Sequence, residues 1–119
     1  MGFQLVISEG KEAGREFLFD QASVVIGRTP ECDVILYDAG VSRRHARIFD
    51  EGAGFHIEDL GSSNGMRVRE KKLVARQTVD VGVGDTIELG STALIVQRSP
   101  MTARLRRLWS HGAFEARLE

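Results

Sequence analysis

Short apolar runs separated by turn residues recur along most of the chain, at intervals of about eight to twelve residues. Glycine-containing turn signals lie between many of them, for example at Gly10, Gly52 and Gly84. This spacing is typical of the short strands of a sandwich or a barrel. The candidate strands, about ten in number, are residues 3–8, 16–19, 23–26, 33–36, 45–49, 55–59, 66–69, 78–81, 86–89 and 93–97. The sequence therefore predicts an all-β fold.

The pattern changes after residue 97, and the change sets a predicted domain boundary. Pro100 ends the strand pattern. Apolar residues then follow at i, i+4, i+7 and i+8, namely Met101, Leu105, Leu108 and Trp109, a spacing that predicts a helix. Phe114 and Leu118 suggest the start of a second helical segment.

At 119 residues the chain has the length of one domain. We therefore expect a sandwich domain over residues 1–98. Residues 99–119 are expected to form a short helical extension, either a linker or the start of a downstream domain. Such a short helix is marginal alone in water, so its apolar stripe needs a partner surface. Self-association through this helix is one way to provide it.

Composition and charge restrict the class of protein. Hydrophobic residues make up 42% and charged residues 28%, and no apolar run approaches the length of a membrane span, so we expect no membrane partner. The start of the chain lacks a secretory signal, and the single cysteine, Cys32, excludes an internal disulfide. A cytoplasmic location fits these features. The net charge is −1, and residues 98–119 carry five arginines and two glutamates, so residues 1–97 carry −4. A mildly acidic body predicts no nucleic-acid partner.

Three loop segments combine residue types that suit an anion. Each lies where a predicted strand ends or begins, so the three can converge at one end of a sandwich. Arg28 offers a forked, permanently charged donor set for phosphate or carboxylate oxygens. Ser42 and Ser63 add small hydroxyl donors, and Asn64 can both donate to and accept from an extended peptide backbone. The segments are Gly27-Arg28, Ser42-Arg43-Arg44-His45 and Asp59-Leu60-Gly61-Ser62-Ser63-Asn64-Gly65.

Taken together, these segments resemble the forkhead-associated (FHA) domain, a family of β-sandwich modules that bind phosphothreonine peptides. The likeness extends over about residues 3–97 and includes the late segment 81–90, which is similar to the closing strand pair of the family. The resemblance implies a sandwich of about ten to eleven strands. It also implies that Arg28 and Ser42 bind the phosphate, that Arg43 and Ser63 contact it or the adjacent backbone, and that Asn64 binds the peptide backbone.

Other residues of the motifs are expected to support this site. The resemblance gives His45 a mainly structural role in bracing the loop that presents Ser42, and it includes Gly27 and Gly65 in the motif. Asp59 is expected to cap or brace the Asn64-Gly65 turn. The Gly40-Val41 pair before Ser42 is small and uncharged. In the family this stretch helps to set the preference for residues after the phosphothreonine, so the pair leaves selectivity for an acidic residue open.

Alternative chemistries are less consistent with the sequence. Ser42, His45 and Asp59 contain the residue types of a hydrolase triad, but no strand-turn-helix nucleophile motif accompanies them. The histidines are scattered and cysteine pairs are absent from the sequence, so no metal or other cofactor is predicted. We therefore expect a non-enzymatic binding module that recognises a phosphothreonine-containing partner, as a signalling adaptor or regulatory domain. The alternative is an association module of the same shape that dimerises and does not read phosphate.

Overall fold

The computed structural model describes residues 3–50, 54–98 and 114–116. Twelve strands and no helix are found in these residues. They are β1 (Phe3–Glu9), β2 (Glu16–Phe19), β3 (Ser23–Gly27), β4 (Val34–Ile35), β5 (Ala46–Asp50), β6 (Phe55–Asp59), β7 (Met66–Val68), β8 (Lys71–Leu73), β9 (Thr78–Val81), β10 (Thr86–Leu89), β11 (Thr92–Arg98) and β12 (Phe114–Ala116).

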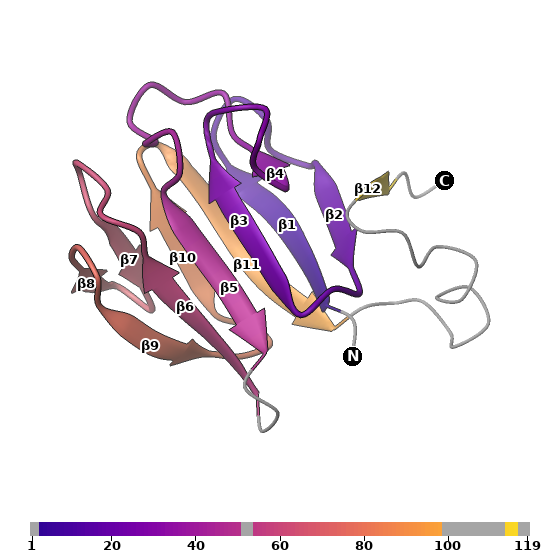
Figure 1. Ribbon diagram of the computed structural model, residues 1–119. Coiled ribbons are helices and arrows are strands. Elements are labelled where there is room, and N and C mark those ends of the chain that lie inside the picture. The colour runs from indigo at the N-terminus through magenta and orange to yellow at the C-terminus, as the bar shows by residue number, and fades with distance from the viewer. Residues whose placement is uncertain (1–2, 51–53, 99–113, 117–119) are drawn as a thin grey trace.

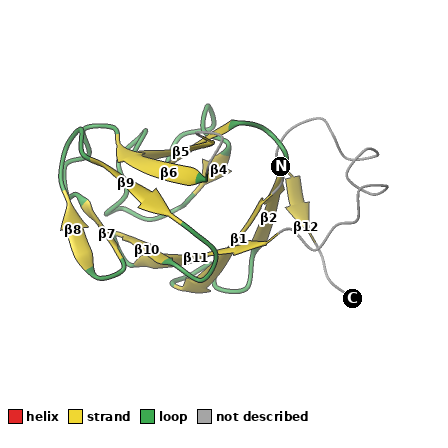
Figure 2. Cartoon of the chain, turned by 90° about the horizontal axis from the view of Figure 1, so that it is seen from below, coloured by secondary structure: helices red, strands yellow, loops and turns green. Residues whose placement is uncertain are grey.

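The strands form two sheets that pack face to face as a sandwich. The first is 7-stranded, in the order β12-β2-β1-β11-β10-β7-β8, and the second is 5-stranded, in the order β4-β3-β5-β6-β9. Figure 1 shows the second sheet in front of the first, and Figure 2 shows the two layers from below. Within the described residues, neighbouring strands pair in antiparallel fashion except the short pair β3 and β4, which is parallel. The predicted all-β sandwich is confirmed.

Alternation along the strands builds the core. In β1, Phe3, Leu5 and Ile7 are all at most 2% exposed. They belong to the same buried cluster as Ile26 and Ile48 of the opposite sheet. Because side chains alternate across a strand, a residue every second position supplies this inner face. Burying one such side chain contributes about 1.5–3 kcal/mol to the stability of the folded state. The packed sandwich therefore fixes the positions at which the connecting loops begin and end.

The predicted strands overlap β1–β7 and β9–β11, but β8 was not expected. It pairs with β7 through a two-residue turn, since Val68 faces Lys71 directly. The turn residues are Arg69 and Glu70, with φ angles of 52° and 69°. A tight hairpin of this kind usually has Asn or Gly where φ is positive, so Arg-Glu gave no turn signal in the sequence.

The Asn64-Gly65 turn differs from the expected one. Gly65 has a φ of 69°, in the left-handed region, whereas Asn64 is absent from the positive-φ residues of the described chain. The strands on either side, β6 and β7, lie in different sheets. The turn therefore carries the chain from one layer of the sandwich to the other instead of closing a hairpin.

The C-terminal extension is only partly described. Its predicted helical stripe, residues 101–109, lies outside the described residues. Phe114, where a second helical segment was expected, instead begins β12, which pairs with β2 in antiparallel register. That local prediction is wrong because the backbone of the edge strand β2 provides hydrogen-bond partners that spacing along the sequence cannot reveal. In the described part of the chain, no helix is long and apolar enough to span a membrane.

Candidate functional site

The three loop segments singled out from the sequence meet at one end of the sandwich (Figure 1). Arg28 directly follows β3, and its backbone N–H lies 3.1 Å from both the Ser42 and the Arg43 carbonyl oxygens. This places the Gly27-Arg28 segment beside the Ser42–His45 loop. Ser42 in turn contacts the third segment, because its Oγ accepts a hydrogen bond from the Ser63 N–H at 3.1 Å. The structure thus brings Arg28, Ser42 and Ser63 together.

His45 connects two of these loops from within the core. Its side chain is 0% exposed, and its Nδ1 accepts a hydrogen bond from the Ser42 N–H at 3.0 Å. Its Nε2 lies 2.8 Å from the Gly65 carbonyl oxygen. Since a carbonyl can only accept, Nε2 carries the proton and His45 is the neutral Nε2–H tautomer. His45 therefore holds the Ser42 backbone and the Gly65 turn at a fixed separation, and it does not face a ligand.

Asp59 shapes the third loop. Its buried carboxylate accepts hydrogen bonds from the N–H groups of Gly61 and Ser62 at 2.9 and 2.7 Å, and from the Ser62 hydroxyl at 2.6 Å. The Ser62 hydroxyl oxygen then accepts from the Gly65 N–H at 3.0 Å. This is a carboxylate-capped turn, as the sequence predicted. Because Asp59 is 0% exposed and occupied by these donors, it is unsuited to act as the acid of a triad.

Asn64 projects from the tip of this loop and is exposed. Its Nδ2 donates to the Gly40 carbonyl oxygen at 3.0 Å, which ties the third loop to the stretch that precedes Ser42. The second side-chain N–H and the side-chain oxygen of Asn64 have no hydrogen-bond partner among the described residues. Those groups can still donate to and accept from the backbone of an extended peptide.

The backbone carbonyl oxygen of Arg43 accepts several hydrogen bonds that join the loops of the site. Besides the Arg28 N–H, it accepts from the Thr29 hydroxyl and from the Cys32 thiol, each at 3.1 Å. Cys32 is buried at 7% exposure. Sequence reasoning found neither Thr29 nor Cys32, because both act on a backbone group of a distant loop. Their donors fix the Arg43 main chain while its guanidinium remains exposed.

Gly27 lies so close to the Arg43 carbonyl oxygen that this position requires a glycine. A Cβ atom there would lie 2.2 Å from the Arg43 carbonyl oxygen and 2.7 Å from Cys32 Sγ. We expect Gly27→Ala to lower the free energy of unfolding by about 1–3 kcal/mol, the range for overpacking, and to weaken ligand binding by displacing Arg43. Chemical denaturation measures the first effect. Gly82→Ala is the matched control, because its Cβ would come no closer than 4.0 Å to another group. Equal stabilities of the two variants would contradict this role for Gly27.

Two of the arginines at this end have no carboxylate partner in the described chain. Arg15, Arg47 and Arg69 all pair with carboxylates. For Arg28 and Arg43, by contrast, no ion pair or side-chain hydrogen bond is found within the described residues, and both are exposed. Two exposed guanidinium groups without a carboxylate partner, on residues whose backbones adjoin Ser42, favour the binding of an anion. The described residues contain no group of three or more potential metal ligands.

Asp38 braces the loop before Ser42, and sequence reasoning missed it. Its carboxylate accepts from the Gly40 N–H, the Ser91 N–H and the Thr92 hydroxyl at 2.8–2.9 Å. Burial raises the pKa of Asp38, but these hydrogen bonds and the charge of Lys11 outweigh it and hold the pKa below its usual value. The bracing is therefore present above the unfolded pKa of about 3.9 and is lost as the pH falls through the folded pKa. An Asp two residues before a glycine is a turn signal that the sequence did contain.

Comparison with known proteins identifies the fold. The family model of the FHA domain matches residues 24–90, which include all three loop segments. The chain belongs to the FHA domain family. Among curated FHA relatives, the glycogen accumulation regulator GarA of Mycolicibacterium smegmatis is 39% identical over 99 residues, covering 81% of this chain and 59% of the relative. The oxoglutarate dehydrogenase inhibitor of Corynebacterium diphtheriae is 35% identical over 96 residues, covering 81% and 65%. The chain thus spans about three fifths of the length of these relatives.

Solved FHA structures superpose on the sandwich. An FHA domain from a study of phosphothreonine-dependent interactions has a TM-score of 0.72 and 32% identity, covering 85% of this chain and 100% of its own. Mycobacterium tuberculosis EmbR, solved with a low-affinity phosphopeptide, has a TM-score of 0.73 and 34% identity, covering 85% of this chain and 25% of its own. Phosphopeptide binding is therefore a property of the FHA family at this level of similarity.

Proposed function

We propose that the protein binds a phosphothreonine-containing segment of a partner protein through Arg28, Ser42, Arg43, Ser63 and Asn64. The observation that carries the proposal is that Arg28 and Arg43, two exposed arginines without a carboxylate partner in the described chain, are joined to each other and to Ser42 by backbone hydrogen bonds. The Ser42 oxygen accepts from the Ser63 N–H, so its own proton is free to be donated to an anion.

Phosphate is the anion that suits this arrangement. It carries about −1.5 to −2 charge at pH 7 and offers three acceptor oxygens. The planar fork of Arg28 matches two of these oxygens, and the Ser42 hydroxyl is a further donor. A hydrogen bond to a charged group contributes about 1.5–3 kcal/mol. The site as a whole can therefore supply about −8 kcal/mol, which corresponds to a micromolar dissociation constant.

The role that follows is that of a regulatory binding module and not of an enzyme. Two relatives are a glycogen accumulation regulator and an oxoglutarate dehydrogenase inhibitor, both named for a regulatory role. His45 and Asp59 are both fully occupied by structural hydrogen bonds, which leaves Ser42 without the base that a nucleophile needs. The partner of this protein is accordingly proposed to be a phosphoprotein, encountered in the cytoplasm.

Selectivity for threonine is the first measurable consequence. A phosphothreonine peptide should bind more tightly than the matched phosphoserine peptide, because the extra methyl group contributes about 0.8 kcal/mol when buried. Its branched side chain also has fewer rotamers to lose. Together these effects correspond to about a fourfold or larger difference in affinity. Calorimetric titration of the two peptides and of the unphosphorylated peptide measures it, and the unphosphorylated peptide should not bind.

The same titration separates this proposal from the association alternative. An FHA-shaped module that only dimerises would bind phosphorylated and unphosphorylated peptides equally weakly, and its sedimentation would change with protein concentration. The proposed function would be overturned if the phosphothreonine and phosphoserine peptides bound with equal affinity and the unphosphorylated peptide bound just as well. If only the two phosphopeptides had equal affinity, the extra methyl group would simply not be buried in the complex.

A further inference from the structure

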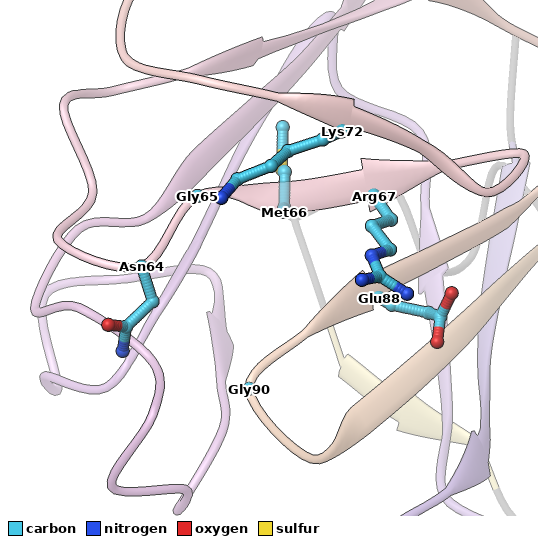
Figure 3. A pocket seen from close by; sticks show the side chains of 7 residues that line it. All are labelled: Asn64, Gly65, Met66, Arg67, Lys72, Glu88 and Gly90. Carbon is cyan, nitrogen blue, oxygen red and sulfur yellow. The ribbon is translucent and has the colours of Figure 1, made fainter.

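A groove of about 430 Å³ begins at Asn64 and runs away from the three loops. Figure 3 shows its seven lining residues, which are Asn64, Gly65, Met66, Arg67, Lys72, Glu88 and Gly90. Asn64 is the residue proposed to bind the peptide backbone, so the groove continues directly from the phosphate site. A peptide anchored at Asn64 therefore has a path along the surface of β7, β8 and β10.

Three charged residues form one row across this path. Arg67 of β7 is the register partner of both Lys72 of β8 and Glu88 of β10. Because neighbouring positions on a strand point to opposite faces, the row lies on the outer face of the sheet, while Met66 and Val68 are buried. The row carries two positive charges and one negative charge, in contrast to the net charge of −4 over residues 1–97.

The charges of this row are available to a ligand. Arg67 and Lys72 are exposed, and neither forms an ion pair or a side-chain hydrogen bond within the described residues. In Figure 3 the Arg67 side chain extends from β7 toward Glu88 of β10, whereas Lys72 extends back toward Gly65. Consistently, Lys72 Cε lies 3.4 Å from the position that a Cβ on Gly65 would occupy. The Lys72 ammonium group is thus near the end of the groove that adjoins Asn64.

Two of the lining residues are glycines at positions where no side chain fits. Gly65 and Gly90 both have positive φ angles, 69° and 58°. A Cβ on Gly65 would lie 2.9 Å from the Leu73 carbonyl oxygen, and one on Gly90 would lie 2.8 Å from Asp38 Oδ1. Side chains are therefore excluded at both positions. The result is a groove with exposed backbone on its surface and charged side chains around it, which suits an extended peptide.

We propose that this groove binds the residues that flank the phosphothreonine on one side, and that Lys72 and Arg67 select an acidic side chain there. The inference rests on the proposed function and adds to it the class of partner sequence. Electrostatic complementarity carries it, because the Gly40-Val41 pair offers no charge and the Lys72–Arg67 pair offers two. Glu88 opposes the acidic ligand, and its negative charge limits the preference to about the strength of one exposed ion pair.

The test scans an acidic residue along a phosphothreonine peptide. The parent peptide has alanine at the four positions on either side of the phosphothreonine, and each variant carries one aspartate at one of them. We expect tighter binding for aspartate on one side only, by about two- to fivefold, the range of an exposed ion pair. Lys72→Glu should remove or reverse this gain in affinity from aspartate, and Arg67→Ala should reduce it. Glu88→Gln should increase it.

Lys71→Glu is the matched control, because it makes the same change of charge one residue away, at a position that does not line the groove. It should leave the aspartate preference unchanged. All of these variants should bind the alanine peptide with nearly wild-type affinity. A wild-type preference that survives Lys72→Glu, or the absence of any aspartate preference, would overturn the inference while the proposed function stands. Failure of every phosphopeptide to bind would overturn both.

Discussion

Replacing Arg28 by alanine is expected to abolish phosphopeptide binding and to leave the fold intact. The guanidinium is exposed and has no partner among the described residues, so its removal breaks no internal side-chain contact. The backbone N–H that joins Ser42 and Arg43 is kept in the alanine variant. Loss of two charge-assisted hydrogen bonds, at about 1.5–3 kcal/mol each, should weaken binding at least about 100-fold. Calorimetry with a phosphothreonine peptide measures the change.

Arg44→Ala is the appropriate control for that experiment. Arg44 is also exposed and lies two residues from Ser42, so its removal changes the net charge by the same amount without touching the proposed phosphate contacts. We expect at most a few-fold loss of affinity, in line with an exposed, screened charge. If both variants lost affinity equally, the phosphate would be attracted by general charge and not held by Arg28. A thermal melt shifted by Arg28→Ala would instead give Arg28 a structural role.

Replacing His45 by alanine is expected to lower the stability of the fold directly and to lower peptide affinity only as a consequence. The variant leaves the Ser42 N–H and the Gly65 carbonyl oxygen without their partner, and it opens a cavity at a position that is 0% exposed. An orphaned buried polar group costs about 1–3 kcal/mol. We expect the free energy of unfolding to fall by about 2–4 kcal/mol in total. Peptide affinity should fall as a consequence, because both loops lose their fixed separation.

Chemical denaturation of His45→Ala and of His56→Ala tests this expectation. His56 is only partly buried, and its Nδ1 has no hydrogen-bond partner in the described chain. Its removal breaks a ring contact with Phe49, whose ring centroid lies 5.8 Å away, and no side-chain hydrogen bond found in the described chain. We therefore expect a loss below about 1 kcal/mol for His56→Ala. An unfolding curve of His45→Ala that overlays the wild type would refute its bracing role.

Much of the fold was predictable because buried apolar residues recur at every second position along the strands. The alternation of Phe3, Leu5 and Ile7 is a local signal that survives without knowledge of any partner strand. The strands that escaped prediction depend on other information. β8 follows a turn of Arg69 and Glu70 that lacks the usual residue types, and β12 exists only because β2 offers an unpaired edge.

The candidate site was likewise predictable only in part. Its motif residues lie together because each sits at a strand end, and strand ends were visible in the sequence. The residues that hold them in place were not visible. Cys32 acts on the carbonyl of Arg43, and Asp38 acts on the N–H of Ser91, 53 positions away. Contacts to backbone groups leave no residue signature at the partner position.

The hydrogen bonds that tie Ser63 to Ser42 and Asn64 to Gly40 exist before any ligand arrives. Little ordering of the protein is then needed on binding, so the association rate should be that of ordinary docking, about 10⁵–10⁷ M⁻¹s⁻¹. With a micromolar dissociation constant, the complex would dissociate at about 0.1–10 s⁻¹. A complex that lasts about a second repeatedly exposes its phosphothreonine to a phosphatase, so the amount of bound partner can follow the balance of kinase and phosphatase closely in time.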